Sequence, residues 1–155
     1  MKASCIYKTE KEYKIITQSE TDIGLFISDD PIFILPIISD IEDVKEAIFK
    51  CLNNSRKGIY TPKQDEWGKW QKERLKKMKE KSYIGLDKRS NYVGIRLEKN
   101  VLVISPGKYT HRQGFEIVEK DIVEIGYSPD KEMEITERII EMLKVDYKLA
   151  VQKTS

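Results

Sequence analysis

Residues 65–145 constrain the fold more than any other part of the chain, because helical and strand patterns alternate within this one stretch. Apolar side chains at helical spacing first predict an amphipathic helix. Two runs rich in β-branched and aromatic residues then predict a hairpin. Ser128 followed by Pro129 predicts the start of a final helix. The apolar face of the first helix is formed by Trp67, Trp70, Leu75 and Met78, and the hairpin strands are Tyr92–Leu97 and Val101–Ile104.

Short apolar runs near the N-terminus predict a small antiparallel sheet, since polar clusters separate them. We expect Asp29 and Asp30, which precede Pro31, to form a turn between two of these strands. Ser39 then begins a helix, and Glu42 three residues later completes a capping box. The predicted strands are Ala3–Tyr7, Tyr13–Thr17, Ile23–Ile27 and Ile32–Leu35, and the apolar stripe of the helix is Ile41, Val44, Ile48, Cys51 and Leu52.

The length of 155 residues favours one compact domain. A chain of this size buries roughly two thirds of the surface that its unfolded form exposes. Charged residues make up 35% of the chain, yet aliphatic and aromatic residues are frequent enough to form a core. We therefore predict an α+β fold with antiparallel strands and about three substantial helices, in a single domain of residues 1–155. The one plausible seam lies at residues 53–62.

Cysteine usage and hydropathy bear on the compartment in which this protein acts. Cys5 and Cys51 have neither metal-ligand spacing nor the density of a disulfide scaffold, so we expect buried, reduced thiols. The first residues lack the apolar run of a secretory signal. The longest apolar stretch, Ile32–Ile38, is too short to span a bilayer. These features predict a cytoplasmic protein that does not bind a membrane.

The sequence offers little for catalysis. His111 is the only histidine, and no activated nucleophile lies near it in the sequence. Paired metal ligands and glycine-rich phosphate loops are missing from the sequence as well. We therefore expect no catalytic residue, no metal site and no cofactor. A small enzyme that uses His111 as a general base is the weakest alternative that we consider.

The net charge of +2 is too small to indicate nucleic-acid binding, but the excess is concentrated in one helix. Residues 63–82 carry 8 basic and 4 acidic groups. A module that binds nucleic acid through this helix is the main alternative function. We favour a solvated helix face, because glutamates dilute the charge and the tryptophans have the spacing of core residues. The lysines on this face are Lys69, Lys72, Lys76 and Lys79.

Motifs spread over residues 39–145 resemble those of the immunity proteins of contact-dependent growth inhibition systems. Asp65–Trp70 (DEWGKW) is similar to the Trp-x-x-Trp opening of a helix in that family. Leu102–Pro106 (LVISP) is similar to the end of its strand pair. The remaining matches are Lys81 with Ser82 in the turn after the helix, and Asp121–Val123 with Ser128 before the last helix.

The resemblance implies a small cytoplasmic protein, not an enzyme, that binds and blocks the C-terminal toxin domain of a cognate delivered effector. We expect that toxin to be a nuclease, and hence the contact residues to be acidic. Helix capping and solubility are the alternative explanation for the same carboxylates. The oligomeric state stays open at this point. The candidate toxin-binding residues are Asp29, Asp30, Asp40, Glu42, Asp43, Glu134, Glu137 and Glu141.

Overall fold

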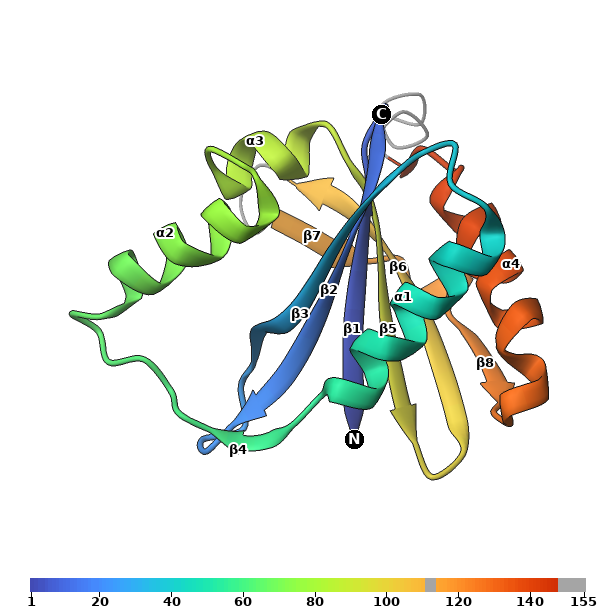
Figure 1. Cartoon of the computed structure of the whole chain (residues 1–155), viewed down its shortest axis with the longest axis horizontal. Helices are drawn as coiled ribbons and strands as arrows, with labels where there is room; N and C mark the ends of the chain where they lie inside the picture. Colours follow the sequence, from blue (N-terminus) through green and yellow to red (C-terminus); the bar gives the residue numbers. More distant parts are fainter. Residues whose placement is uncertain (111–113, 148–155) are drawn as a thin grey trace.

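The computed structural model describes residues 1–110 and 114–147, which form an eight-stranded sheet with helices on both faces (Figure 1). The strands are β1 (Lys2–Lys8), β2 (Glu12–Thr21), β3 (Phe26–Pro36), β4 (Lys57–Ile59), β5 (Asn91–Glu98), β6 (Val101–Thr110), β7 (Gly114–Ile117) and β8 (Val123–Gly126). Their order is β3-β2-β1-β5-β6-β7, with β4 also paired to β2 and β8 also paired to β6. All pairs are antiparallel except β2 with β4. The N-terminal strand therefore lies in the middle of the sheet.

The helices of the described residues form two layers, which Figure 1 shows on opposite sides of the strands. One layer consists of α1 (Ile41–Asn54) and α4 (Glu132–Leu143), and the other of α2 (Trp67–Met78) and the short α3 (Tyr83–Lys88). Two 3₁₀ turns, η1 (Glu119–Asp121) and η2 (Pro129–Lys131), flank β8. The predicted α+β class with three substantial helices is thus confirmed. Over the described ranges, no helix is both long and apolar enough to cross a membrane.

Alternation along the strands divides the buried side chains between two cores, because successive residues point to opposite faces. Ile6 on β1 packs beneath α1 and α4, whereas its neighbour Cys5 packs beneath α2 and α3. The first core is the larger, and each fully buried aliphatic side chain in it contributes about 1.5–3 kcal/mol. Its central members are Ile6, Ile15, Ile48, Leu52, Val93, Ile95, Leu102, Ile104, Ile135 and Ile139.

The second core joins α2 and α3 to the sheet through a mixture of aliphatic and aromatic groups. Met78 and Leu86 are buried against Cys5 and Ile16. Both cysteines, Cys5 and Cys51, are buried and free, which confirms the prediction of reduced thiols. Aromatic rings extend this core toward β7: Tyr92 stacks on Phe115 at 4.7 Å and meets Tyr7 edge-on at 5.2 Å.

The turn predicted at Asp29 and Asp30 is wrong, because both residues lie within the single long strand β3. This strand replaces the two predicted strands on either side of Pro31 and starts at Phe26, later than the first of them. A register shift opposite Ile16 and Thr17 accommodates the irregularity. β3 is an edge strand. A proline is tolerated there, because its missing N–H can face the side that has no neighbouring strand.

The predicted end of the second hairpin strand at Ile104 is also wrong, because β6 continues through Pro106 to Thr110. The carbonyl of Pro106 accepts a hydrogen bond from the Val118 N–H at 2.8 Å, so the proline still takes part in pairing. Gly107 lets aromatic rings pack on the strand: a Cβ there would lie only 2.8 Å from Cδ1 of Tyr92.

The start of α1 differs from the predicted capping box. Asp40, not Ser39, is the N-cap residue, and its side chain makes no cap hydrogen bond. Glu42 instead accepts a hydrogen bond from Lys45 Nζ at 2.6 Å. The predicted apolar stripe of this helix is confirmed, since Val44, Ile48, Cys51 and Leu52 are all buried.

Candidate partner-binding surfaces

The C-terminal half of α2 is fixed to the edge strand by ion pairs. Arg74, which is itself buried, places Nη2 3.1 Å from Oδ1 of Asp30. Lys77 places Nζ 2.8 Å from the other carboxylate oxygen. Partial burial would raise the pKa of Asp30, but the hydrogen bond from Lys77 and the charge of Arg74 hold it below its ordinary value. This half of the helix therefore has little freedom to move away from the sheet.

The turn after α2 is fixed by a buried ionic cluster. Lys14 on β2 is fully buried, and its Nζ donates to the Met78 carbonyl at 2.6 Å and to the Glu80 carboxylate. Arg89 donates to the same carboxylate from the other side. Burial alone would raise the pKa of Glu80, but the hydrogen bonds from Arg89 and Lys14 lower it. No charge in this cluster is left without a partner.

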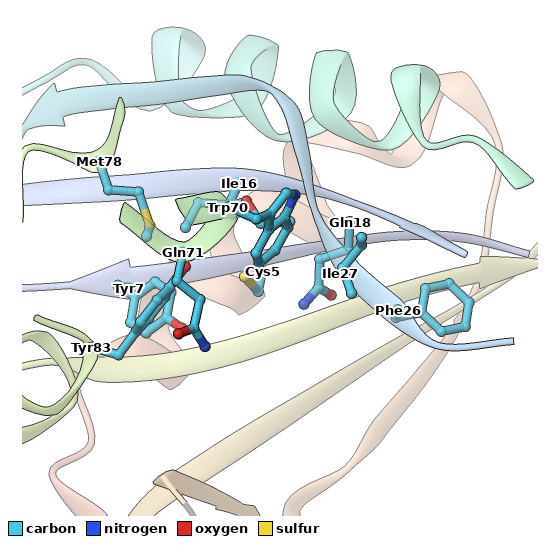
Figure 2. Close-up of a pocket in the computed structure, with 11 residues that line it drawn as sticks. Cys5, Tyr7, Ile16, Gln18, Phe26, Ile27, Trp70, Gln71, Met78 and Tyr83 are labelled. Atoms are coloured by element: carbon cyan, nitrogen blue, oxygen red, sulfur yellow. The ribbon is translucent and has the colours of Figure 1, made fainter. Parts of the chain in front are cut away.

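The N-terminal half of α2 stands further from the sheet and leaves a pocket beneath it, the α2 pocket (Figure 2). Its volume is about 290 Å³. Trp70 and Gln71 form the wall contributed by the helix, and Cys5 and Gln18 form part of the floor. Phe26 lies at the β3 end of the pocket.

The core packing predicted for Trp67 and Trp70 is only partial. Both side chains are half-buried, and their rings meet edge-to-face at 5.1 Å. Trp70 lines the α2 pocket, whereas Trp67 does not. Periodicity placed these residues on the sheet-facing side of the helix, but it did not show that this end of α2 leaves space beneath it.

The lining of the α2 pocket contains no charged side chain, although 35% of the residues in the chain are charged. Gln18, Ser28 and Gln71 supply the polar groups. Burial, the main cause, raises the pKa of the Cys5 thiol to about 12, so this sulfur stays protonated and is not a nucleophile. The pocket can thus accept an uncharged group, and Cys5 does not supply a nucleophile to react with it.

A second hollow, of about 470 Å³, lies on the same face where no helix covers β5 and β6. Val101 and Val103 supply its apolar lining, and Arg96 lies at its border. The Arg96 guanidinium also stacks 4.3 Å above the ring of Phe26, which lines the α2 pocket. The two hollows are therefore adjacent and share one cationic group.

The opposite side of the molecule carries six of the eight predicted acidic residues. We call these exposed carboxylates of the α1–α4 layer the acidic surface. Asp43 makes no hydrogen bond or ion pair through its side chain with the described residues, whereas Glu141 is bonded to Lys144 at 2.9 Å. The structure thus brings residues from two distant parts of the sequence onto one layer. The acidic surface consists of Asp40, Glu42, Asp43, Glu134, Glu137 and Glu141.

Asp29 and Asp30 lie apart from the acidic surface and already have partners. Asp29 is buried and accepts hydrogen bonds from Arg56 Nε at 2.9 Å and from Ser19 Oγ at 2.6 Å. Burial opposes ionisation, yet the Arg56 hydrogen bond holds the pKa of Asp29 below its ordinary value. Asp30 binds α2 as described. Their role in toxin binding stays a prediction. Their structural role is to hold Arg56 and helix α2 against β3.

The lysines of α2 lie on the exposed side of that helix, as the sequence predicts. This helix carries five basic residues and one glutamate, whereas α4 carries four glutamates and one arginine. The two helices belong to opposite layers, so positive and negative charge are separated across the sheet. The four predicted lysines are all exposed: Lys69, Lys72 and Lys76 lie in α2, and Lys79 is its C-cap residue.

His111, the one candidate general base, lies outside the described residues. Across 1–110 and 114–147, no group of three acidic, histidine or cysteine side chains is arranged to hold a metal ion. What the same residues do present is an acidic surface on one helical layer and an uncharged pocket beneath the other.

The family is shown by comparison with known proteins. The model of the CDI immunity protein family, CdiI, matches residues 2–134, and the chain belongs to this family. The resemblance found in the sequence is thereby confirmed, and so is the expectation that the protein is not an enzyme, since CdiI proteins are non-enzymatic inhibitors. A search of curated proteins found no match.

Two solved structures share the fold. A protein of unknown function from Neisseria meningitidis is 22% identical with a TM-score of 0.70, over 92% of this chain and 93% of that one. The CdiA-CT/CdiI toxin and immunity complex from Yersinia pseudotuberculosis is 14% identical with a TM-score of 0.66, over 92% and 97%. At these identities the likeness concerns the fold alone.

Proposed function

We propose that this CDI immunity protein binds the C-terminal toxin domain of a cognate delivered effector in the cytoplasm and so blocks its activity. The observation that carries the proposal is the family match over residues 2–134. The Yersinia relative with the same fold was solved as a complex of toxin and immunity protein, which supports inhibition by direct binding. A rigid domain with preformed surfaces suits this task, because it loses little conformational entropy on association.

We further propose that the toxin is a nuclease whose basic surface meets the acidic surface of the α1–α4 layer. A nuclease needs positive charge to hold the phosphates of its substrate. Carboxylates placed against that charge would occupy the same groups and speed the encounter. Asp40 and Asp43 support this role, because neither side chain is used in a cap or an ion pair among the described residues.

The test is a calorimetric titration of this protein into the toxin domain encoded beside it. We expect a one-to-one complex with roughly nanomolar affinity, the range of specific, well-packed protein complexes. The triple variant Glu134→Lys, Glu137→Lys, Glu141→Lys should bind at least about tenfold more weakly, mainly through slower association with a weaker salt dependence. A nuclease assay of the free domain then identifies its activity.

A matched control reverses the charge of exposed glutamates elsewhere. Glu116→Lys with Glu119→Lys, on β7 and η1, should leave the affinity within about twofold. Failure of the wild-type protein to bind the toxin domain would refute the function itself. Equal losses in both sets of variants would refute the acidic surface as the contact.

A further inference from the structure

We propose that the α2 pocket receives an apolar side chain from a segment of the toxin domain that carries acidic residues on either side of it. This inference rests on the proposed function and adds a second contact to it. It concerns the face of the sheet opposite the acidic surface, where α2 and the uncovered strands form a corner (Figures 1 and 2).

The wall of the α2 pocket is held in place before any partner arrives. Asp30 binds both Arg74 and Lys77 of α2, and the turn after the helix is fixed by Lys14. Met78, one turn beyond Arg74, is fully buried in the second core. A partner would therefore meet a formed pocket, and little ordering of the helix would be needed on binding.

The size and lining of the pocket fit an apolar side chain. A buried cavity of about 150 Å³ holds a benzene molecule. The α2 pocket, at about 290 Å³, has room for an aromatic or large aliphatic group and part of its main chain. Trp70, Phe26 and Tyr83 present ring surfaces, which are typical of the residues that dominate binding energy at interfaces.

Hydrogen bonding and charge narrow the choice of occupant further. Gln18 and Gln71 can pair with the main-chain N–H and C=O groups of an inserted segment. A charged side chain would lose its hydration here without gaining an opposite charge. The interior of the pocket therefore selects for an uncharged group.

Three basic side chains, Arg74, Lys77 and Arg96, border the pocket. Arg74 and Lys77 share the single carboxylate of Asp30. Arg96, above the Phe26 ring, has no carboxylate within ion-pair distance among the described residues. Two carboxylates on this face oppose these charges without pairing with Arg96: Glu98 on β5, and Glu20 on β2, which lies opposite Phe26. Acidic residues beside the inserted side chain would pair with Arg96, which lacks a carboxylate partner within the described ranges.

The α1 side of the acidic surface and the α2 pocket both border β3, whereas α4 with Glu134, Glu137 and Glu141 lies over β5 and β6. Strand β3 contacts α1 on one face of the sheet and α2 on the other. It also forms the end of the strand order, so no further strand lies beyond it within the described sheet. The α2 pocket is therefore open to a segment of the toxin domain that approaches the sheet from the β3 edge.

The experiment titrates the toxin domain with variants of the full-length protein. Trp70→Ala should weaken binding by about tenfold or more, mainly through faster dissociation, as expected on loss of an interface anchor. Ile84→Ala is the matched control, because Ile84 is an exposed apolar side chain on the neighbouring helix α3 and does not line the pocket. It should change the affinity by less than about threefold.

A second pair of variants tests the charge of the occupant. Gln71 is exposed at the pocket wall, so either charge can be introduced there without burying it. Gln71→Glu should weaken binding by several fold, whereas Gln71→Lys should preserve or strengthen it. Thermal unfolding and circular dichroism confirm that each variant is folded.

The outcomes separate the two proposals. Binding by Trp70→Ala equal to that of the wild type would overturn the pocket contact while leaving the proposed function intact. A larger loss for Gln71→Lys than for Gln71→Glu would overturn the acidic character of the segment. No complex with the wild-type protein would overturn the function, and the pocket contact with it.

Discussion

Lys14 shows how a single buried charge positions a whole helical layer. Its ammonium group reaches the carbonyl at the end of α2 and the carboxylate in the following turn, Glu80. A lysine in a sheet is an unusual interior residue, since its desolvation is costly unless every donor finds an acceptor. Here the second core and the α2 pocket both depend on that match.

Replacing Lys14 tests this dependence. Lys14→Ala should lower the free energy of unfolding by about 3–5 kcal/mol, because Glu80 is left in a nearly buried site with one partner fewer. Urea denaturation followed by tryptophan fluorescence measures the change. Lys144→Ala removes an exposed pair with Glu141 and should cost only about 0.2–1 kcal/mol. Similar costs for the two variants would contradict the role given to Lys14.

Glu80 should also give the protein a pH-dependent stability. Its pKa is lowered in the folded state, so the unfolded chain takes up a proton first as the pH falls. The stabilisation by Glu80 is therefore complete above its ordinary pKa of about 4.5 and is lost as the pH falls below that value. Glu80→Gln should be less stable at pH 7, and its stability should fall less steeply between pH 5 and pH 3 in urea titrations. A parallel decline of both proteins would exclude Glu80 as a contributor.

Gly107 is the residue that lets strand β6 carry aromatic packing on its surface. Gly107→Ala would push a methyl group against Tyr92 and Phe115, where the nearest contacts are 2.8 and 3.1 Å. We expect a loss of about 1–3 kcal/mol from overpacking, measured by chemical denaturation. Gly126→Ala in β8 is the control, because its nearest neighbour is the flexible end of Lys131 at 3.9 Å. Equal stability of the two variants would show that the rings move aside at no cost.

At the scale of elements, local periodicity was sufficient to predict that the main helices and the β5–β6 hairpin exist, but not where α1 begins or β6 ends. The apolar stripes of α1 and α4 depend on residues three or four apart, which a sequence displays directly. The length of β3 depends instead on groups far along the chain: Arg56 satisfies Asp29 across 27 positions, and Arg74 satisfies Asp30 across 44. Local sequence propensity predicts a turn at these residues, because it contains no information about partners so far away in the chain.

The candidate surfaces, like the strands and helices, could be predicted from the sequence only in part. The helical spacing of Glu134, Glu137 and Glu141 places these three candidates along one side of α4. These glutamates share a surface with the carboxylates of α1 because α1 and α4 pack in one layer. That packing is set by the topology of the whole sheet, which the sequence does not display. The α2 pocket was missed altogether. The sequence offers one signal for it, because Trp67 and Trp70 lie together at the start of a helix whose other residues are mostly polar.

At the scale of the whole molecule, the central position of β1 should govern local stability. This strand is paired on both sides and covered on both faces. Its backbone amides should exchange with solvent only on global unfolding. The amides of β7 and β8, which each pair with β6 alone, should exchange faster by at least about tenfold. Hydrogen exchange followed by mass spectrometry or NMR measures the difference, and uniform protection would argue against this ranking.

The same topology affects how soon a newly made molecule can protect its cell. β1 leaves the ribosome before β2 to β8, yet one of its two partners, β5, ends at Glu98. At about 5–20 residues per second, translation separates the two strands by roughly 5–20 seconds. During that time neither core can close, so the nascent chain has no formed surface to offer a toxin. Protection in a growing cell therefore depends on molecules completed earlier, which makes a standing reserve of folded protein part of how such immunity works.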